Sequence, residues 1–312
     1  MSPIHIGWHT LGYIKLTRHY IPGKNIWGAM TANLTRTYGS KGIDGYKEFG
    51  DLLKTKILTS YFYPALDPDK PLLPHFTKQG LCYGIHAAED CTAKNDNYIA
   101  GEFERLFIGS FGQTAILPQS NTAEDESLHE SEYISPCINE KENRKPVFFV
   151  GYICIKKNIA LKDGRKVGLT TGNGCLMPAI QELFVGGDLK YGWGHLKLQN
   201  SPEDEGCQKK MFGYEFVSNC NSPPCIEIPK GSTLPAHLKV ESGLKIKGDI
   251  EPLVGRQWGT VRDREGKEIS GAGREISSTG VCWMPGSIME EMEEKKPQTL
   301  RIGEFGILTK ED

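Results

Sequence analysis

The sequence contains no long uninterrupted apolar segment. Lys and Arg break every hydrophobic run short of the roughly 18 residues that a membrane-spanning helix needs. It also lacks a signal-peptide pattern, any C-x₂-C pair among its nine Cys residues, and an excess of either charge, the net charge being −2. These absences argue against a membrane partner and a disulfide framework. They predict a cytoplasmic protein whose thiols are mostly small buried hydrophobes.

The charges that are present are unevenly distributed along the chain. Residues 1–57 hold eight Lys or Arg against three acids, and residues 150–200 hold seven against three. Acidic residues gather between positions 124 and 142 and again between 290 and 294. Segregation of this kind permits a basic groove on a nearly neutral protein, although both basic segments are equally consistent with solvated faces.

Hydrophobic periodicity predicts the elements of the first 200 residues. Ile26, Met30 and Leu34 recur every four residues after Pro22-Gly23, which indicates a helix, and Phe49 to Ile57 carries a second amphipathic pattern. Strand-like runs and a third helix complete the set, with strands at 4–7, 13–20, 107–117, 147–155 and 193–198 and the helix at about 175–184.

This order of elements predicts an α+β, ferredoxin-like (RRM-like) core in residues 1–200. In that arrangement two helices cover one face of a sheet, and the open face can bind single-stranded RNA. The polar, acidic stretch 118–145 is an insertion, either a flexible loop or a protruding hairpin.

The sequence after Asn200 turns to Gly, Pro and short apolar runs. We expect residues 201–312 to form a second, β-rich domain, with strands at 244–250, 276–283 and 300–308. Within it, Gly255–Trp258 and Gly271–Gly273 indicate ordered turns.

A Gly-rich segment, Val185–Gly194, packs four Gly residues into ten positions between the predicted third helix and a strand. Its order excludes the GxGxxG fingerprint, and the GxxxxGK[ST] phosphate loop is absent, so no cofactor is expected. Backbone N–H groups of such a loop can cradle phosphate, Lys190 adds charge, and Tyr191 and Trp193 can stack on bases. The alternative is a tight turn with core aromatic residues.

A second turn, Tyr20–Lys24, leads into the first helix, whose free N–H groups favour an anion. Lys15, Arg18, His19 and Lys24 surround it. On its own, a turn of this kind is a weak signal.

Together the two turns resemble a known family. A "yIPGxxxxGA" turn that opens the first helix, with a "GGxxxxGxG" loop that closes the later one, resembles the RAMP superfamily of CRISPR-associated proteins. Thr114–Ile116, Thr122-Ala123 and Ser127–Glu132 are similar to the signature of the protruding thumb in backbone-type subunits. The resemblance covers residues 3–198 and leaves 201–312 unplaced.

The resemblance implies a guide (crRNA)-binding structural subunit of a type III-like ribonucleoprotein effector complex in antiviral defence. Its partners would be the crRNA guide, target RNA and other effector subunits, and its thumb, an insertion at 112–146, would wedge into the guide–target duplex. Carried over by position, the guide-contacting residues are Gly23, Lys24, Gly186, Gly187, Lys190, Gly192 and Gly194. Charge and aromatic character add Lys15, Arg18 and Tyr191 to these RNA-binding candidates.

Two departures from the family favour binding over cutting. Target-cutting subunits carry an Asp between the first strand and the IPG turn, whereas residues 8–20 hold neither Asp nor Glu. The catalytic candidates in that window are His9 and His19, although a lone His is more often structural. Guide-processing endoribonucleases have the Gly-rich loop near the C-terminus, whereas more than a hundred residues follow it here. A RAMP-fold endoribonuclease and a protein–protein adaptor with purely structural Gly turns remain the alternatives.

Three thiols, Cys207, Cys220 and Cys225, lie close enough in sequence to suggest a zinc site completed by His195 or His237. Their spacing is loose and includes no C-x₂-C pair, so ordinary buried thiols are the stronger prediction and no metal is expected.

Overall fold

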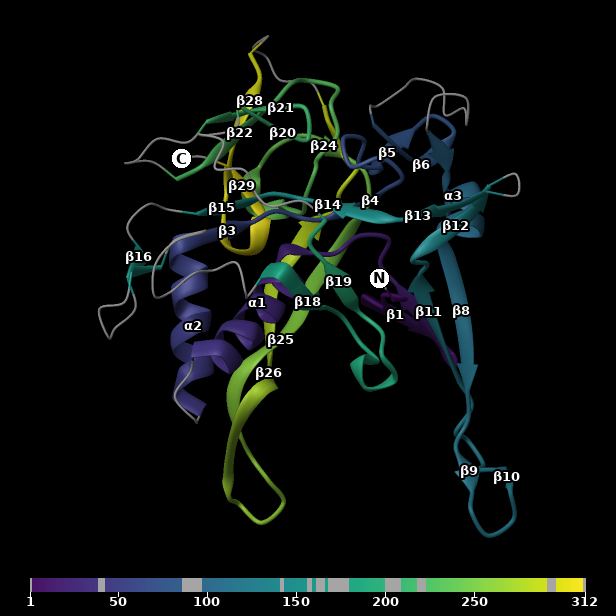
Figure 1. Ribbon diagram of the computed structural model, residues 1–312. Coiled ribbons are helices and arrows are strands. Elements are labelled where there is room, and N and C mark those ends of the chain that lie inside the picture. The colour runs from purple at the N-terminus through teal and green to yellow at the C-terminus, as the bar shows by residue number, and fades with distance from the viewer. Residues whose placement is uncertain are drawn as a thin grey trace.

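The computed structural model describes residues 2–38, 43–85, 97–140, 143–155, 159–160, 166–167, 180–199, 209–217, 223–290 and 296–310. It is a mixed α and β structure, as predicted. Figure 1 shows α1 and α2 together on one side of the body, α3 on the other side, and two long hairpins that extend from the body in the same direction.

The N-terminal part places two helices after a β-hairpin. The buried side chains Ile26, Met30 and Leu34 of α1 pack with Phe49 and Leu53 of α2, which confirms the predicted periodic faces. The elements of this part are β1 (Gly7–Leu11), β2 (Ile14–Thr17), α1 (Gly23–Tyr38), α2 (Ile43–Lys56), β3 (Ile57–Thr59), β4 (Tyr63–Ala65), β5 (Leu73–Thr77), β6 (Gly80–Gly84), β7 (Tyr98–Ile99) and α3 (Ala100–Phe107).

Residues 118–134 of the predicted insertion, 118–145, belong to a protruding hairpin of residues 108–134 rather than to a flexible loop. It consists of β8 (Ile108–Gln113), β9 (Ile116–Leu117), β10 (Thr122–Ala123) and β11 (His129–Ile134). Its base joins a four-stranded sheet in the order β1-β2-β11-β8, and β9 and β10 pair at the tip. We call residues 108–134 the thumb hairpin (Figure 1). β12 (Cys137–Glu140) and β13 (Asn143–Pro146) form a separate pair.

The third predicted helix is wrong over its last residues. Residues 175–179 lie outside the described part, Ile180 and Gln181 are helical, and Glu182–Phe184 form a strand. That strand, β18, pairs with β19 (His195–Lys197), which satisfies its backbone hydrogen bonds without a helix. Between them lies the 3-10 turn η2 (Leu189–Tyr191), and before them come β14 (Phe148–Val150), β15 (Ile153–Ile155), β16 (Ile159–Ala160) and β17 (Lys166–Val167).

The hydrogen bonds of the described strands establish the α+β class and do not confirm the ferredoxin-like order. The strands on either side of the helix pair lie in different sheets: β2 pairs with β1 and β11, whereas β3 pairs with β15.

The C-terminal part is β-rich, as expected. An eight-stranded sheet runs in the order β20-β21-β22-β28-β29-β23-β26-β25. The elements are β20 (Lys210–Met211), β21 (Tyr214–Val217), β22 (Cys225–Ile228), β23 (Leu238–Lys239), η3 (Val240–Ser242), β24 (Ile246–Lys247), β25 (Ile250–Arg262), β26 (Glu268–Trp283), β27 (Ile288–Met289), β28 (Gln298–Ile302), η4 (Glu304–Gly306) and β29 (Leu308–Lys310).

Two turns predicted in this part are wrong. Gly255–Trp258 and Gly271–Gly273 lie within β25 and β26, which pair along their length to form the second long hairpin, the β25–β26 hairpin. The chain instead reverses near Asp263, whose carboxylate accepts the backbone N–H groups of Glu265 and Lys267.

The two parts of the chain share a core. Tyr20, Tyr61 and Tyr63 from the first 200 residues pack with Ile228 and Leu308 from the C-terminal part in one buried cluster. The domain boundary at residue 200 stays a prediction.

One cysteine departs from the expected pattern. Cys82 is disulfide-bonded, whereas the sequence predicted mostly buried thiols in a reducing compartment. Cys282 is a buried thiol, and burial raises its pKa to about 11. In the described part of the chain, no helix combines the length and the apolar character needed to cross a bilayer.

Candidate nucleic-acid groove

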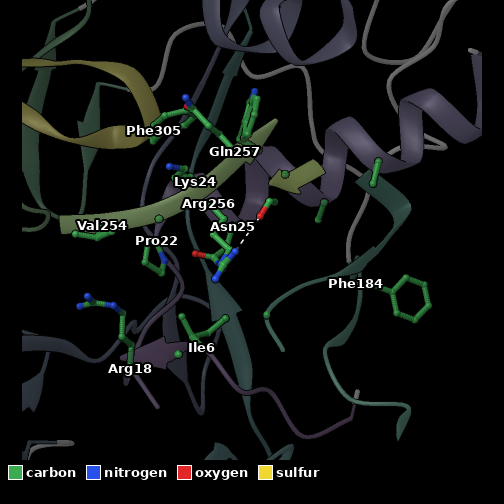
Figure 2. A pocket seen from close by; sticks show the side chains of 18 of the residues that line it. Ile6, Arg18, Pro22, Lys24, Asn25, Phe184, Val254, Arg256, Gln257 and Phe305 are labelled. Atoms are coloured by element: carbon green, nitrogen blue, oxygen red, sulfur yellow. Dashed lines mark hydrogen bonds between the residues drawn. The ribbon is translucent and has the colours of Figure 1, made fainter. Parts of the chain in front are cut away.

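A cavity of about 420 Å³ lies where α1, the Gly-rich segment and the β25–β26 hairpin meet. We call it the α1 groove. Figure 2 shows Lys24 and Asn25 of α1 close to the strand that carries Arg256 and Gln257. Its walls come from four parts of the chain. The N-terminal elements contribute Ile6, Gly7, Arg18, Pro22, Lys24, Asn25, Trp27, Gly28, Ala29, Ala32, Asn33, Arg36, Tyr46 and Tyr61. Phe184 of β18 and the Gly-rich segment residues Gly186 and Leu189 form a second part, the hairpin residues Leu253 to Gln257, Gly273 and Thr279 a third, and Phe305 and Ile307 a fourth.

The α1 groove is cationic. Among the described residues that line it there is no Asp or Glu, whereas Lys24, Arg36 and Arg256 all contribute side chains. Arg36 and Arg256 each donate one hydrogen bond of 3.1 Å, to Asn33 Oδ1 and to the carbonyl of Gly273. A guanidinium group has five N–H donors, so most of their donor capacity is available to a ligand.

Lys24 is held at the contact between α1 and the hairpin. Its ammonium donates to Ser277 Oγ and lies 5.6 Å from the centre of the Phe305 ring. Burial, together with the neighbouring charge of Lys54, lowers the pKa of Lys24, while Glu304 acts in the opposite sense. An anionic ligand would stabilise the charged form of this partly buried ammonium, because a nearby negative charge offsets the cost of its burial.

Arg18, a predicted RNA contact that lines the groove, is already paired. Its side chain is 9% exposed, and its two terminal nitrogens donate to the Glu251 carboxylate at 2.5 and 3.0 Å. Trp8 Nε1 and His237 Nε2 reach the same carboxylate at 2.9 and 2.6 Å. Arg18 therefore joins the N-terminal part to β25, and its charge is neutralised within the protein.

The Glu251 carboxylate is the centre of this buried network. Burial alone would raise its pKa, but the hydrogen bonds from His237 and Arg18 and the Arg18 charge lower it to about 2. Burial lowers the pKa of the His237 ring, which favours the neutral form of the ring. In that form its Nδ1 accepts a hydrogen bond from the Tyr61 hydroxyl at 2.6 Å. Every polar group of the set has a partner, as a buried network requires.

Four of the predicted Gly contacts have structural reasons to be Gly. A Cβ on Gly23 would lie 2.4 Å from the carbonyl oxygen of Phe305, and one on Gly186 would lie 2.1 Å from that of His5. At Gly194 it would lie 2.2 Å from the Val185 carbonyl oxygen, and at Gly187 it would lie 3.0 Å from His5 Cδ2. These positions are therefore Gly for reasons internal to the fold, and their contact with RNA stays a prediction.

The rest of the segment forms an exposed rim. Gly192 has a φ of +82°, a Cβ added there would meet no atom within 4 Å, and Lys190 and Tyr191 beside it are exposed. Trp193 instead is buried and packs edge-on against Tyr133, with ring centres 5.1 Å apart. The rim adjoins the α1 groove through Leu189 and does not line it.

The two catalytic candidates lie apart from the α1 groove. His9 is exposed on β1, and Lys15 is half-buried on β2. His19 lines a second cavity of about 400 Å³ with Glu104 and Glu132. Its Nδ1 lies 2.7 Å from the Tyr83 hydroxyl, and burial lowers its pKa to about 4, so the ring is neutral at physiological pH.

The second cavity corrects one step of the sequence reasoning. Residues 8–20 hold no acid, but α3 and β11 bring Glu104 and Glu132 to the same cavity as His19. Burial, with the charge of Glu132, raises the pKa of Glu104. An empty sequence window therefore does not by itself exclude acid–base groups near His19.

The proposed zinc ligands are not brought together within the described residues. Cys207 and Cys220 lie outside them, and Cys225 is buried, with its thiol donating to the Pro223 carbonyl at 3.3 Å. His237 is engaged with Tyr61 and Glu251, and His195 Nε2 lies 3.5 Å from Glu182. The described part of the chain holds no group of three or more potential ligands.

Sequence reasoning missed the hairpin wall of the groove. Arg256 and Gln257 sit in a stretch that the sequence predicted to be a turn, and Asn25 and Arg36 follow the IPG motif on the helix. The sequence did contain a signal for the helical wall. One face of the first helix carries only polar or small residues, namely Asn25, Gly28, Ala32 and Arg36, at spacings of three or four.

No family model matches the sequence, and no curated protein matches it. Solved structures that are similar include two of one complex. One is a cryo-EM structure of the type III-B Cmr-beta complex bound to cognate target RNA and AMPPnP, with a TM-score of 0.47 and 9% identity over 92% of this chain and 83% of that chain. The other is the same complex bound to cognate target RNA, with a TM-score of 0.45 and 10% identity over 93% of this chain and 84% of that chain. Both are structures of a type III-B complex.

Proposed function

We propose that this chain is an RNA-binding structural subunit of a type III-like CRISPR effector complex, and that the α1 groove holds the guide strand. The observation that carries the proposal is the meeting of Pro22 and Gly186, one from each Gly turn, at a cavity lined by Lys and Arg and by no described carboxylate. Neutralisation of phosphates by such cations is the main sequence-independent term in nucleic-acid affinity.

The thumb hairpin contributes to this function in a different way. Residues 106–140 contain no Lys or Arg, so the hairpin cannot attract phosphates. It does expose large apolar side chains, with Phe111 at 55%, Ile116 at 62% and Leu128 at 58%. Apolar wedges of this kind can separate stacked bases. A ferredoxin-like core, a wedge in the guide–target duplex, a cytoplasmic location and contacts with other effector subunits remain parts of the proposal.

The proposal is tested by the binding of fluorescein-labelled single-stranded RNA, measured by fluorescence anisotropy at several salt concentrations. We compare the parent with Arg36→Glu and Arg256→Glu, and with Arg301→Glu, an exposed Arg on β28, as the matched control. Each groove variant should weaken binding at least about tenfold and lower the salt slope by about 0.7 for each lost phosphate contact.

Two outcomes would overturn the proposal. One is equal loss in Arg301→Glu and in the groove variants, because the effect would then report net charge only. The other is an absorbance ratio typical of pure protein when the chain is co-expressed with its neighbouring subunits and a guide. That result would favour the adaptor with purely structural Gly turns.

The second cavity supports one further candidate, an endoribonuclease of the same fold. His19 and Glu104 lie in this one cavity, and His and Glu are residue types that serve general acid–base cleavage. Mapping of cuts on a labelled target in the assembled complex separates the two functions. We expect no cut opposite this subunit, and a cut that disappears in His19→Ala would establish the nuclease instead.

A further inference from the structure

The hairpin wall of the α1 groove comes from the part of the chain that the sequence motifs leave unplaced. Arg256 and Gln257 project from β25, and Gly273 from β26 completes the wall. β25 is also the last strand of the eight-stranded sheet in the described part of the chain, and its residues line the same groove as those of α1.

This wall is fixed against the helices. The Lys24 side chain packs against β25 at Gly255, where an added Cβ would lie only 2.9 Å from Lys24 Nζ. The Lys24 ammonium also donates a hydrogen bond to Ser277 Oγ on β26. Farther along, Trp258 stacks on Tyr46 of α2, with ring centres 5.3 Å apart and planes 28° apart. Contacts at both points hold the hairpin wall in place beside the helices before any ligand binds.

The size and chemistry of the pocket match one nucleotide. A volume of about 420 Å³ falls in the lower part of the range for small-molecule sites, about 300–1,000 Å³. Guanidinium groups at Arg36 and Arg256 suit a phosphate. The side-chain amide of Gln257 can pair with a base edge, since an amide offers both donors and an acceptor. The apolar surfaces of Val254 and Leu189 can cover a base face.

We infer that the α1 groove binds a single unpaired nucleotide and that Gln257 reads its base. The inference rests on the proposed function and adds to it a nucleotide preference at one position of the bound strand. Phosphate contacts fix a strand without distinguishing bases, whereas amide contacts to base edges specify them. Arg256 should therefore govern affinity for every sequence, and Gln257 should govern the difference between sequences.

The test measures binding of four labelled homopolymers, A, C, G and U, each of about ten nucleotides, by fluorescence anisotropy. The parent should prefer one base over the least favoured by at least about tenfold. In Gln257→Leu, the ratio between the best and the worst affinity should fall to within about twofold. In Arg256→Gln, the affinities for all four homopolymers should weaken by a similar factor. Gln79→Leu, in the exposed turn between β5 and β6, is the matched control and should change nothing.

A second pair of variants tests the pocket without removing a contact. Gly28 lines the groove from α1, and a Cβ there would meet no atom within 4 Å. The longer side chain of Gly28→Leu should therefore occupy the groove and weaken binding of all four homopolymers at least about tenfold, whereas Gly28→Ala should retain most of the binding. Circular dichroism would verify that both variants are folded.

The results separate this inference from the proposed function. Equal affinity of the parent for all four homopolymers, or a preference that survives Gln257→Leu, would overturn the inference and leave RNA binding intact. Unchanged binding in Gly28→Leu would show that RNA lies elsewhere. Failure of the parent to bind any of the four would overturn both.

Discussion

Replacing Glu251 by Gln should strongly destabilise the protein. The carboxylate is 4% exposed and accepts hydrogen bonds from Arg18, His237 and Trp8. A Gln at this position removes the negative charge that neutralises Arg18 and turns an N–H donor toward groups that are themselves donors. The buried guanidinium of Arg18 would then have no counter-charge.

Two independent estimates give the magnitude. Breaking a buried ion pair by removing one partner typically costs about 3–5 kcal/mol. The pKa of Glu251 falls from the ordinary value of 4.5 to about 2, and at about 1.4 kcal/mol for each pKa unit this corresponds to about 3 kcal/mol. We therefore expect Glu251→Gln to lower the free energy of unfolding by about 3 kcal/mol at neutral pH.

The lowered pKa of Glu251 also determines how its contribution to stability changes with pH. A carboxylate whose pKa is lowered by folding stabilises the protein above its unfolded-state pKa, and that stabilisation is lost as the pH falls toward the folded-state pKa. The difference between parent and Glu251→Gln should be constant near neutral pH. It should shrink below about pH 4.5 and nearly vanish by about pH 2.

Urea unfolding followed by tryptophan fluorescence measures this difference, and Trp8 itself contacts the carboxylate. Glu215→Gln is the control: Glu215 pairs with Lys210 at 3.3 Å, but both side chains are more than half exposed. An exposed pair of this kind contributes about 0–1 kcal/mol. Similar losses in Glu251→Gln and Glu215→Gln would refute the reasoning, as would an Arg18→Met, Glu251→Leu double variant that is less stable than Glu251→Gln.

Three further predictions follow from the site. Gly194→Ala should lower the melting temperature far more than Gly192→Ala, because only the Cβ at position 194 would lie against a carbonyl oxygen, at 2.2 Å. Thermal unfolding monitored by circular dichroism compares the two variants. Burial lowers the pKa of His19 from 6.5 to about 4, so stability should fall as the pH drops through that window, and His19→Gln should flatten the profile in urea titrations at neutral pH and at about pH 5. The exposed tip of the thumb hairpin, with positive φ at Asn121 and Glu126, should be cut by a protease in the free subunit and protected in the assembled complex; equal cutting in both would show that nothing covers it.

The sequence correctly predicted elements that depend on interactions between residues close together in the chain. The α1 helix followed from the four-residue recurrence of Ile26, Met30 and Leu34, and all three side chains are buried. The position of the Gly-rich turn was likewise correct. Its cause was not evident, because the carbonyl oxygens that exclude a Cβ at Gly186 and Gly194 belong to His5 and Val185, and only the fold places them there.

The predicted strand 276–283 lies within β26, but β25 and the first half of β26 were missed for a specific reason. Gly255, Gly259, Gly271 and Gly273 interrupt both strands, and Gly within a strand removes the alternating side chains by which a strand is recognised. The register also shifts twice along the pair. One wall of the candidate site was therefore hidden, while the other, on α1, followed directly from the IPG motif.

The fate of Arg18 shows why a charge count misjudges a binding site. Arg18 added to the basic excess of residues 1–57, yet its partner Glu251 lies 233 residues away and cancels it. Conversely, the acids of residues 106–140 reduce the net charge of the chain but lie on the thumb hairpin and β12, and none lines the α1 groove. Because screening confines the field of an exposed charge to about 10 Å, the groove responds to Lys24, Arg36 and Arg256 rather than to the overall balance of −2. A chain that is nearly neutral as a whole can thus present a strongly cationic cavity to a phosphate.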